Sequence, residues 1–311
     1  MTKLTEFQKR TTIPDALFQY MEEKKLTKAD ISRLSGVGAT ALNYITKRET
    51  VVPNQSGGSE IKDKYYLQLC RAIGLPMKVE VWRHFNTQNF KQIIPAIEEN
   101  RKEKERFTID GDTGSGKSHA LRKYKTKFPV GTYVVTCSAV ENSKEFAKNI
   151  AETVGVETFG TAGSIIKKVI KKLESETDAI LLIDEAEHIG RKSGYINIIK
   201  SLADGLEGKT AFGMVGMGIN KILNDGYEKN KQNFRQTARR FCNREMLENN
   251  IREDVYKACE ELGLNEESVK NWIANRVRNF GELEVYIRKI FKEADKSSTK
   301  INVTFLNTLD L

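Results

Sequence analysis

The segment from Gly111 to Ser118 constrains the fold of this chain more than any other part of its sequence. It reads Gly-Asp-Thr-Gly-Ser-Gly-Lys-Ser. Such a segment connects a strand to a helix, because its glycines let successive backbone N–H groups turn toward phosphate oxygens and the helix N-terminus adds partial positive charge. The flanking residues predict that strand, at 106–109, and a helix after the segment. The segment therefore predicts a phosphate-binding loop in an α/β protein.

The residues of this loop have expected roles in binding ATP with Mg²⁺. Lys117 is expected to reach the β- and γ-phosphates and to assist catalysis, and the Ser118 hydroxyl is expected to bind Mg²⁺. The other residues expected to contact the nucleotide are Gly111, Asp112, Thr113, Gly114, Ser115, Gly116 and His119. A chance match in a surface loop is the alternative, and the strand and helix on either side argue against it.

A second signal is the aliphatic run 180–183, which Asp184 and Glu185 follow. A buried parallel strand reads as a continuous aliphatic run, and its carboxyl end lies beside the bound phosphates. Asp184 is expected to contact the nucleotide and to hold Mg²⁺ through water, while Glu185 is expected to polarise the attacking water as general base. Glu187 and His188 carry a weaker signal, because a lone histidine at such a place is more often a surface or supporting residue.

Strands and helices alternate from Phe107 to about Glu245, which is typical of a parallel sheet. The predicted strands are 106–109, 131–137, 179–183 and 211–217, and the helices between them include 143–154, 161–173 and 196–206. Beyond Glu245 helices are predicted at 254–262, 266–278 and 281–294. The predicted fold class is α/β, with a parallel-sheet ATPase core, a helical C-terminal lid and an N-terminal helix-turn-helix domain. The predicted parts are 1–76 (helix-turn-helix), 77–105 (polar connector), 106–245 (ATPase core) and 246–311 (lid).

Within the connector a helix is expected at 89–105, and its charge-dense end is residues 98–106. We expect this end to be a solvated face.

The N-terminal region resembles the helix-turn-helix of the phage repressor class. Thr27 can cap a helix that stops at Ser35 and Gly36, and a second helix is expected from Ala39 to Ile45. In such units the second helix enters the major groove. The residues expected to face bases are Gly38, Thr40, Asn43 and Tyr44. A plain helical hairpin is the alternative, and residues 51–60 are expected to form a loop or wing.

The chain has a net charge of +9 at pH 7, from 51 basic and 42 acidic residues. This excess favours polyanionic partners such as DNA, although it also fits a role in solubility alone. Candidates for contacts with DNA phosphates are Lys144, Lys148, Lys167, Lys168, Arg191 and Lys192. Basic surface helices are usually just solvated, and contacts of this kind give affinity without much sequence preference.

Several features favour a cytoplasmic protein. No apolar run approaches the roughly 20 residues of a membrane span. Residues 1–10 are polar and do not resemble a signal peptide. The 4 cysteines are scattered without a Cys-x-x-Cys pair, which disfavours a zinc knuckle or a disulfide scaffold.

The order of these motifs resembles the AAA+ ATPases. The phosphate-binding loop is followed by Ile-Asp-Glu-Ala-Glu-His at 183–188, by Gly-Met-Val-Gly-Met-Gly at 213–218 and by an arginine-rich stretch. More narrowly, residues 181–190 and the N-terminal helices resemble the transposition-helper group of MuB, TnsC and IstB, with MuB nearest in layout.

This resemblance implies assembly as a homo-oligomer, a filament or ring, on double-stranded DNA, largely without sequence preference. It implies selection of target DNA and stimulation of a DDE transposase, with hydrolysis of ATP controlling filament disassembly. It also implies that the protein is encoded by a phage or mobile element and acts in the cytoplasm of a bacterial host.

Three elements of the family pattern transfer less directly. The polar sensor after the fourth strand is best matched by Asn220, because Ile219 stands where Asn is expected. The family also has an arginine finger, by which a neighbouring subunit stabilises charge on the transferred phosphoryl group. Arg239 matches it best, and Arg244 is the second candidate. The alternative is a solvated or DNA-facing basic face formed by Lys229, Lys231, Arg235, Arg239, Arg240 and Arg244.

The second sensor arginine is expected in a Gly-x-x-Arg context. Here Glu284 stands at that position, in the tetrad that begins at Gly281. Arg278 or Arg288 could replace it; otherwise hydrolysis is expected to be weak alone and stimulated by DNA or a partner.

Two other functions stay open. A helicase loader or replication-initiation ATPase has the same motifs and also hydrolyses ATP on DNA. A transcriptional regulator would use the N-terminal helices at an operator and the ATPase as a switch, giving a discrete footprint instead of broad coverage. A small-molecule kinase is disfavoured, because nothing in the sequence suggests a second substrate pocket.

Overall fold

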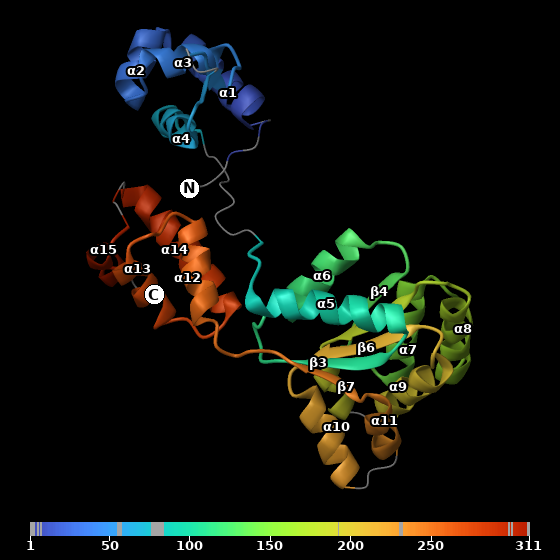
Figure 1. The fold of residues 1–311 in the computed structure, drawn as a ribbon. Helices are drawn as coiled ribbons and strands as arrows, with labels where there is room; N and C mark the ends of the chain where they lie inside the picture. The colour runs from blue at the N-terminus through green and yellow to red at the C-terminus, as the bar shows by residue number, and fades with distance from the viewer. Residues whose placement is uncertain are drawn as a thin grey trace. The chain divides into compact units, whose positions relative to one another are not determined.

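The structure is a computed structural model that describes residues 4, 6, 8–54, 58–75, 84–191, 193–229, 233–297, 299 and 301–309. The chain divides into two compact units (Figure 1). One unit comprises residues 85–255 and 273–286, and the other comprises residues 1–84, 256–272 and 287–311. We describe each unit by itself.

The larger unit is built on a parallel sheet of 5 strands. The strands are β3 (Arg106–Asp110), β4 (Thr132–Thr136), β5 (Ile180–Asp184), β6 (Ala211–Gly216) and β7 (Asn243–Met246). Their spatial order is β4-β5-β6-β3-β7, and every neighbouring pair is parallel. The predicted parallel sheet is confirmed. The edge strand β7 was not predicted, because its residues are polar and mostly exposed.

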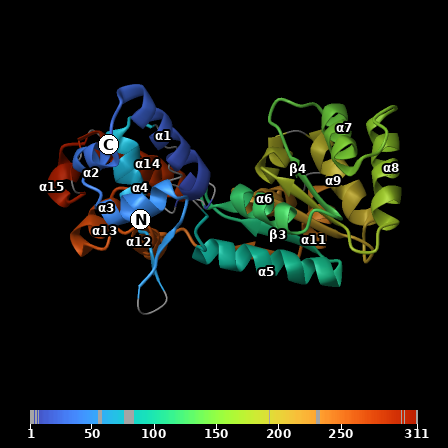
Figure 2. The same ribbon diagram turned by 90° about the horizontal axis from the view of Figure 1, so that it is seen from above.

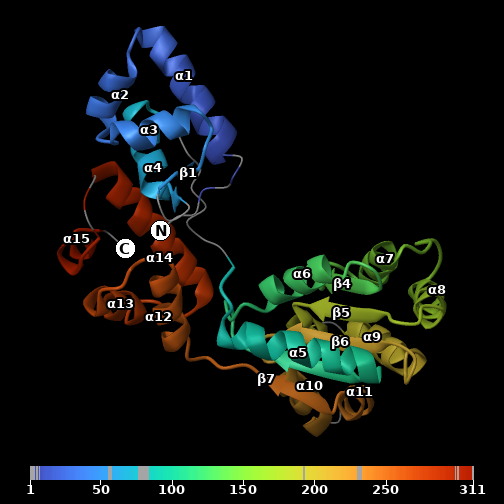
Figure 3. The same cartoon turned by 45° about the horizontal axis from the view of Figure 1, so that its top comes forward.

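Helices cover both faces of this sheet (Figure 3). Against one face pack α5 (Gln88–Glu103) and α6 (Lys117–Lys127). Against the other lie α7 (Ser143–Val154), α8 (Ala162–Glu174), α9 (Ser193–Gly205), α10 (Ile219–Glu228) and α11 (Phe234–Arg240). Figure 2 shows α7, α8 and α9 side by side.

The interior strand β5 explains why the sheet needs cover on both sides. Leu181 and Ile183 belong to the core under α7–α9, whereas Ile180 and Leu182 belong to the core under α5 and α6. Side chains alternate between the two faces of a strand, so a wholly aliphatic run is buried on both.

The end of α5 carries a buried arginine. The Arg101 side chain is only 9% exposed, and its Nε donates to Asp178 Oδ1 at 3.0 Å. Its terminal nitrogens donate to Asp178 O at 2.7 Å, Thr132 Oγ1 at 3.0 Å and Val130 O at 3.1 Å. The prediction of a solvated face at 98–106 is therefore wrong for Arg101. Its partners are remote in sequence, so the local pattern could not reveal them. Helix α5, which falls in the segment assigned to a connector, lies within the larger unit.

The second unit contains the N-terminal helices. They are the π-helix η1 (Gln8–Thr12), α1 (Ile13–Lys24), α2 (Lys28–Ser35), α3 (Ala39–Thr46) and α4 (Asp63–Ala72), with a short antiparallel pair β1 (Val51–Val52) and β2 (Ser59–Glu60). A capping box of Thr27 and Asp30 starts α2, and Gly36 ends it with φ +69°. Both helices form where a helix-turn-helix was expected, and their binding to DNA stays a prediction.

The C-terminal helices are α12 (Arg252–Glu261), α13 (Glu267–Ala274), α14 (Phe280–Ser297) and α15 (Val303–Asn307). Across the described residues we find no helix with the length and apolar character that a membrane span needs.

Arg101→Ala is expected to lower the free energy of unfolding by about 2–4 kcal/mol, because it removes several hydrogen bonds from a buried charged group. Lys102→Ala is the matched control: its side chain is 83% exposed, and the change should stay within about 0.5 kcal/mol. Urea denaturation measures both. Equal losses in the two variants would contradict the buried role of Arg101.

Candidate nucleotide-binding site

The chain between β3 and α6 forms the expected loop. Gly114 and Gly116 adopt φ of +76° and +93°, a region that favours glycine, and Gly116 is the N-cap of α6. The N–H of Gly111 donates to Gly216 O at 3.3 Å, which ties the start of the loop to the end of β6.

Lys117 folds back onto this loop. Its Nζ donates to Gly111 O at 2.6 Å, to Asp112 O at 2.8 Å and to Ser115 Oγ at 3.2 Å. Burial lowers the pKa of Lys117, and the carboxylates of Glu187, Asp184, Asp110 and Asp112 oppose this shift. The Lys117 ammonium thus interacts electrostatically with Asp184 at the end of β5 and with Glu187 after it. Phosphate oxygens would compete for the donors that now hold the loop carbonyls.

Asp184 ends β5 and Glu185 follows it, and the two side chains have different environments. Asp184 is buried, and its Oδ1 accepts a hydrogen bond from the Glu185 N–H at 3.0 Å. Glu185 has φ +54°, unusual for a residue with a side chain, and its side chain is 52% exposed. Strained backbone of this kind clusters at functional sites. His188 Nε2 lies 3.8 Å from Glu185 Oε2, and its buried Nδ1 has no hydrogen-bond partner among the described residues.

The donors fit Mg²⁺. This ion usually takes one or two protein ligands besides substrate phosphates and water. The Ser118 hydroxyl at the start of α6 and the buried Asp184 carboxylate at the end of β5 are such ligands. The charge of Asp184 also opposes the lowering of the pKa of Lys117, the residue before Ser118. Ser118 and Asp184 would hold the ion.

Glu187 has a structural contact that the sequence did not reveal. Its Oε2 accepts a hydrogen bond from the Met217 N–H at 3.1 Å, which joins the turn after β5 to the end of β6. A Cβ on Gly216 would lie 2.5 Å from that oxygen, so only glycine leaves room for the carboxylate.

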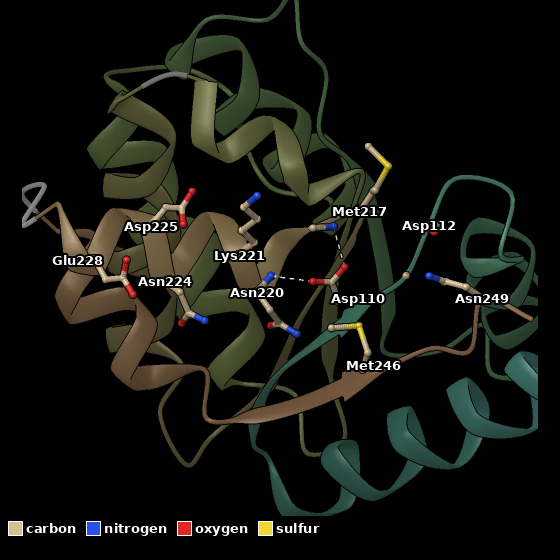
Figure 4. Close-up of a pocket in the computed structure, with 12 residues that line it drawn as sticks. Asp110, Asp112, Met217, Asn220, Lys221, Asn224, Asp225, Glu228, Met246 and Asn249 are labelled. Atoms are coloured by element: carbon tan, nitrogen blue, oxygen red, sulfur yellow. Dashed lines mark hydrogen bonds between the residues drawn. The ribbon is translucent and has the colours of Figure 1, made fainter.

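Asp110, which the sequence analysis missed, organises the next edge of the site. Its carboxylate accepts from the Gly218 N–H at 2.7 Å and from the Asn220 N–H at 2.9 Å, at the start of α10 (Figure 4). The Asn220 side chain is buried, and its Oδ1 accepts from Thr108 Oγ1 at 2.6 Å. The only signal for Asp110 was a charged residue that ends an apolar strand.

A pocket of about 580 Å³ lies beside these residues. Its described lining includes the first loop residues, the start and outer face of α10, Met246 and Asn249 (Figure 4). Lys117, Ser118, Asp184 and Glu185 are not part of that lining. The pocket therefore adjoins the phosphate-binding loop without containing the residues expected to act on the γ-phosphate.

The start of α14 packs directly on the loop. The Phe280 N–H donates to Gly114 O at 3.0 Å, and a Cβ on Gly114 would lie 2.7 Å from the Asn279 side chain. Glu282 belongs to the tetrad expected to carry the second sensor, and it helps to cap α14. Its N–H donates to Asn279 Oδ1 at 2.9 Å, and its Oε2 accepts from the Arg278 N–H at 2.8 Å. Arg278, which immediately precedes Asn279, is exposed.

Asn89 of α5 also supports the loop. It is 2% exposed, and its Nδ2 donates to Ser115 O at 3.2 Å and to Glu248 O at 3.0 Å. Like Asn279, it gave no sequence signal, because its contacts are with distant segments.

The remaining predicted residues are distributed over the larger unit. Thr113 Oγ1 lies 3.2 Å from Met217 Sδ, and the His119 ring centroid lies 6.4 Å from that of Phe90. Arg239 is exposed on α11, whereas Arg244 Nη1 donates to Asn224 Oδ1 at 2.9 Å.

The candidate DNA contacts lie on several elements. Lys144 and Lys148 lie on α7, and Lys167 and Lys168 on α8, where Lys168 pairs with Glu157 at 2.8 Å. Arg191 ends the 3-10 helix η2 (Ala186–Arg191), but its side chain and the whole of Lys192 lie outside the described residues.

In the second unit, α3 exposes Thr40 and Asn43, with Tyr44 half-buried. Lys28 Nζ lies 3.4 Å from Asn43 Oδ1, and Lys47 Nζ lies 5.9 Å from the Tyr44 ring centroid.

Comparison with known proteins bears on this geometry. Residues 100–224 match the family described as AAA domain. The chain is also 25% identical, over 180 residues, to the Mu-like prophage FluMu DNA transposition protein B of Haemophilus influenzae. The match to this relative covers 57% of this chain and 61% of the relative's length. The chain is thus similar to AAA domains over residues 100–224 and, over a longer stretch, to a MuB-like transposition helper.

The fold of this chain is also similar to that of the Aeropyrum pernix ORC1 protein, solved in complex with DNA. The TM-score is 0.52 at 12% identity, over 74% of this chain and 66% of that chain. At this identity the likeness shows the fold alone.

If Glu185 is the general base of this site, Glu185→Gln should keep ATP affinity and lower turnover by at least about 100-fold, because general base catalysis typically contributes 10²–10⁴-fold. Phosphate release measures turnover, and a fluorescent ATP analogue measures affinity. Glu152→Gln, an exposed glutamate of α7, is the control and should leave both unchanged. Normal turnover in Glu185→Gln would remove Glu185 from this role.

Proposed function

We propose that this chain is an ATP-dependent DNA-binding protein that oligomerises on DNA, selects or delivers target DNA and stimulates a DDE transposase. One observation carries the proposal: a chain with the residues of an ATP site is similar to a protein named for DNA transposition. The transposase cuts and joins DNA, and this chain supplies an ATP-dependent switch. We place it in the cytoplasm of a bacterial cell.

The chemistry follows from the loop and β5. Backbone N–H groups of 111–117 and Lys117 bind the phosphates, and Ser118 and Asp184 hold Mg²⁺, which neutralises charge on the phosphate oxygens. Glu185 accepts the proton of the attacking water, and the products are ADP and phosphate. In this role the neighbouring His188 keeps the Glu185 carboxylate near the reaction, since the two side chains lie 3.8 Å apart.

Hydrolysis by the isolated chain is proposed to be weak. The position of the expected second sensor holds Glu284, and Glu282 in the same tetrad is engaged in capping α14. Arg278, next to the loop-contacting Asn279, is the better replacement, because it adjoins the phosphate-binding loop in the same unit. An arginine from a neighbouring subunit, for which Arg239 is the candidate, would complete the site. Slow hydrolysis would let an ATP-bound filament persist on DNA until a partner stimulates turnover.

DNA would be held through phosphate contacts. The lysines of α7 and α8 are the candidates in the larger unit, and α3 with Thr40, Asn43 and Tyr44 is the candidate in the other. Contacts to phosphates position a protein on DNA without reading its sequence.

The N-terminal helices favour one alternative, an ATP-switched transcriptional regulator. A capped α2, a glycine turn and an exposed polar face on α3 are the features a helix-turn-helix reader uses. A discrete footprint at one operator would support this alternative, and broad ATP-dependent protection of DNA would support the main proposal. Stimulation of strand transfer by a cognate transposase separates the main proposal from a helicase loader.

Lys117→Ala tests the coupling between ATP and DNA. We expect ATP affinity to fall by roughly 100-fold, because hydrogen bonds to charged groups contribute about 1.5–3 kcal/mol each. ATP-dependent retention of DNA in a filter-binding assay should be lost with it. Lys123→Ala, an exposed lysine of the same helix α6, should behave like the parent protein. Unchanged ATP-dependent DNA binding by Lys117→Ala would reject the coupling.

A further inference from the structure

The pocket beside the phosphate-binding loop has one long wall on helix α10. Three of its lining residues, Asn220, Asn224 and Glu228, follow one another at intervals of four residues on this helix. Residues four apart lie on the same side of a helix, so the wall extends for about 12 Å. An extended chain covers that length with about four residues. The pocket is therefore long enough for a short extended segment.

Negative charge dominates the described lining of this pocket. Its charged residues are one lysine, Lys221, and four acidic residues, Asp110, Asp112, Asp225 and Glu228. The Asp110 carboxylate is engaged by the N–H groups at the start of α10. Across the described residues, the other three carboxylates have no basic side chain within ion-pair distance. On a chain of net charge +9, this local excess of negative charge favours a cationic ligand.

Asn220 adds a buried hydrogen-bond donor to the same wall. The residue is 8% exposed and held at two points, because its N–H donates to Asp110 and its Oδ1 accepts from Thr108 Oγ1 at 2.6 Å. In the part of the chain that the structure describes, its Nδ2 has no acceptor. Figure 4 draws this side chain among the lining residues. A buried donor without an acceptor costs free energy, so it favours a ligand that brings an oxygen atom.

Two methionines give the lining an apolar part. Met217 follows β6 and Met246 ends β7, and they are 43% and 61% exposed. Both line the pocket (Figure 4). A methionine side chain is flexible and adapts to irregular apolar groups, such as the aliphatic stems of lysine and arginine. The lining thus offers apolar contact for the stem of a basic side chain and carboxylates for its charged end.

We propose that this pocket binds an extended segment of a partner protein that carries basic residues at alternate positions. A backbone carbonyl of the segment accepts from Asn220 Nδ2, and two basic side chains bind Asp225 and Glu228. Alternate side chains of an extended chain lie on one face, about 7 Å apart. Residues three apart on a helix have Cβ atoms about 5–6 Å apart, so long basic side chains can reach both carboxylates.

Other ligands satisfy only part of this lining. A phosphate group brings an acceptor for Asn220, but the carboxylates repel it. A polyamine brings positive charge but no oxygen atom, whereas a basic peptide brings both. The site goes beyond the proposed function, because Lys117, Asp184 and Glu185 lie outside the described lining.

The test measures binding of a fluorescein-labelled peptide, Ala-Arg-Ala-Arg-Ala, to the full chain by fluorescence anisotropy. Saturable binding is expected, and the neutral peptide Ala-Gln-Ala-Gln-Ala should not bind. Asp225→Asn/Glu228→Gln should raise the dissociation constant by about 10-fold, because two ion pairs are lost, and each single change should give a smaller rise. The control Glu152→Gln removes an exposed carboxylate from α7 and should bind like the parent protein.

Two further measurements separate this site from its alternatives. Spermidine has positive charge but no acceptor for Asn220, so it should displace the labelled peptide at least about 10-fold less effectively than the unlabelled peptide does. Lys117→Ala should bind the peptide normally. Normal peptide binding with lost ATP binding keeps the fate of this site distinguishable from that of the proposed function.

Several outcomes would overturn the inference: no saturable binding of the arginine peptide, an equal loss in Glu152→Gln, or equal displacement by spermidine. Thermal unfolding of each variant checks that a loss of binding is local. If Asp225→Asn/Glu228→Gln weakens self-association in sedimentation while peptide binding is unchanged, the pocket takes a second copy of the chain and the proposal of a partner's segment is wrong.

Discussion

The parallel pairing of β3, β6 and β5 is the interaction on which the rest of the site depends. Asp110 pairs with Gly216, and Ile183 pairs with Met214, so the three strands end at one edge of the sheet. This register places the phosphate-binding loop and the acidic pair after β5 on the same side. Because each strand is buried on both faces, helices must cover both sides, and the edge with the strand ends stays accessible.

Polar residues outside the motifs then hold this edge in shape. Asn89 holds the loop at Ser115, Glu187 ties the turn after β5 to β6, and Asn279 packs on Gly114 at the start of α14. None of them has to touch the nucleotide. They fix the backbone whose N–H groups would bind phosphate, so the geometry of the site depends on side chains from three separate segments.

The sequence predicted those parts whose signal is local. The strands β3, β4, β5 and β6 were predicted, β5 because a buried strand reads as a continuous aliphatic run, and α7 was predicted at 143–154. The structure adds that Asn142 and Glu145 form a capping box at the start of α7. The edge strand β7 was missed, because it pairs on one side only and carries polar residues. Arg101, Asp110 and Asn89 could not be assigned, because their partners lie far away in sequence.

The central claim is that ATP, bound at this edge, drives assembly of many copies on DNA. Electron microscopy of the chain with double-stranded DNA and a slowly hydrolysed ATP analogue tests it most directly. The account predicts regular oligomers, filaments or rings, that cover DNA of unrelated sequences and disappear when the analogue is replaced by ADP. Isolated dimers at one site, or coverage that does not depend on the nucleotide, would contradict it.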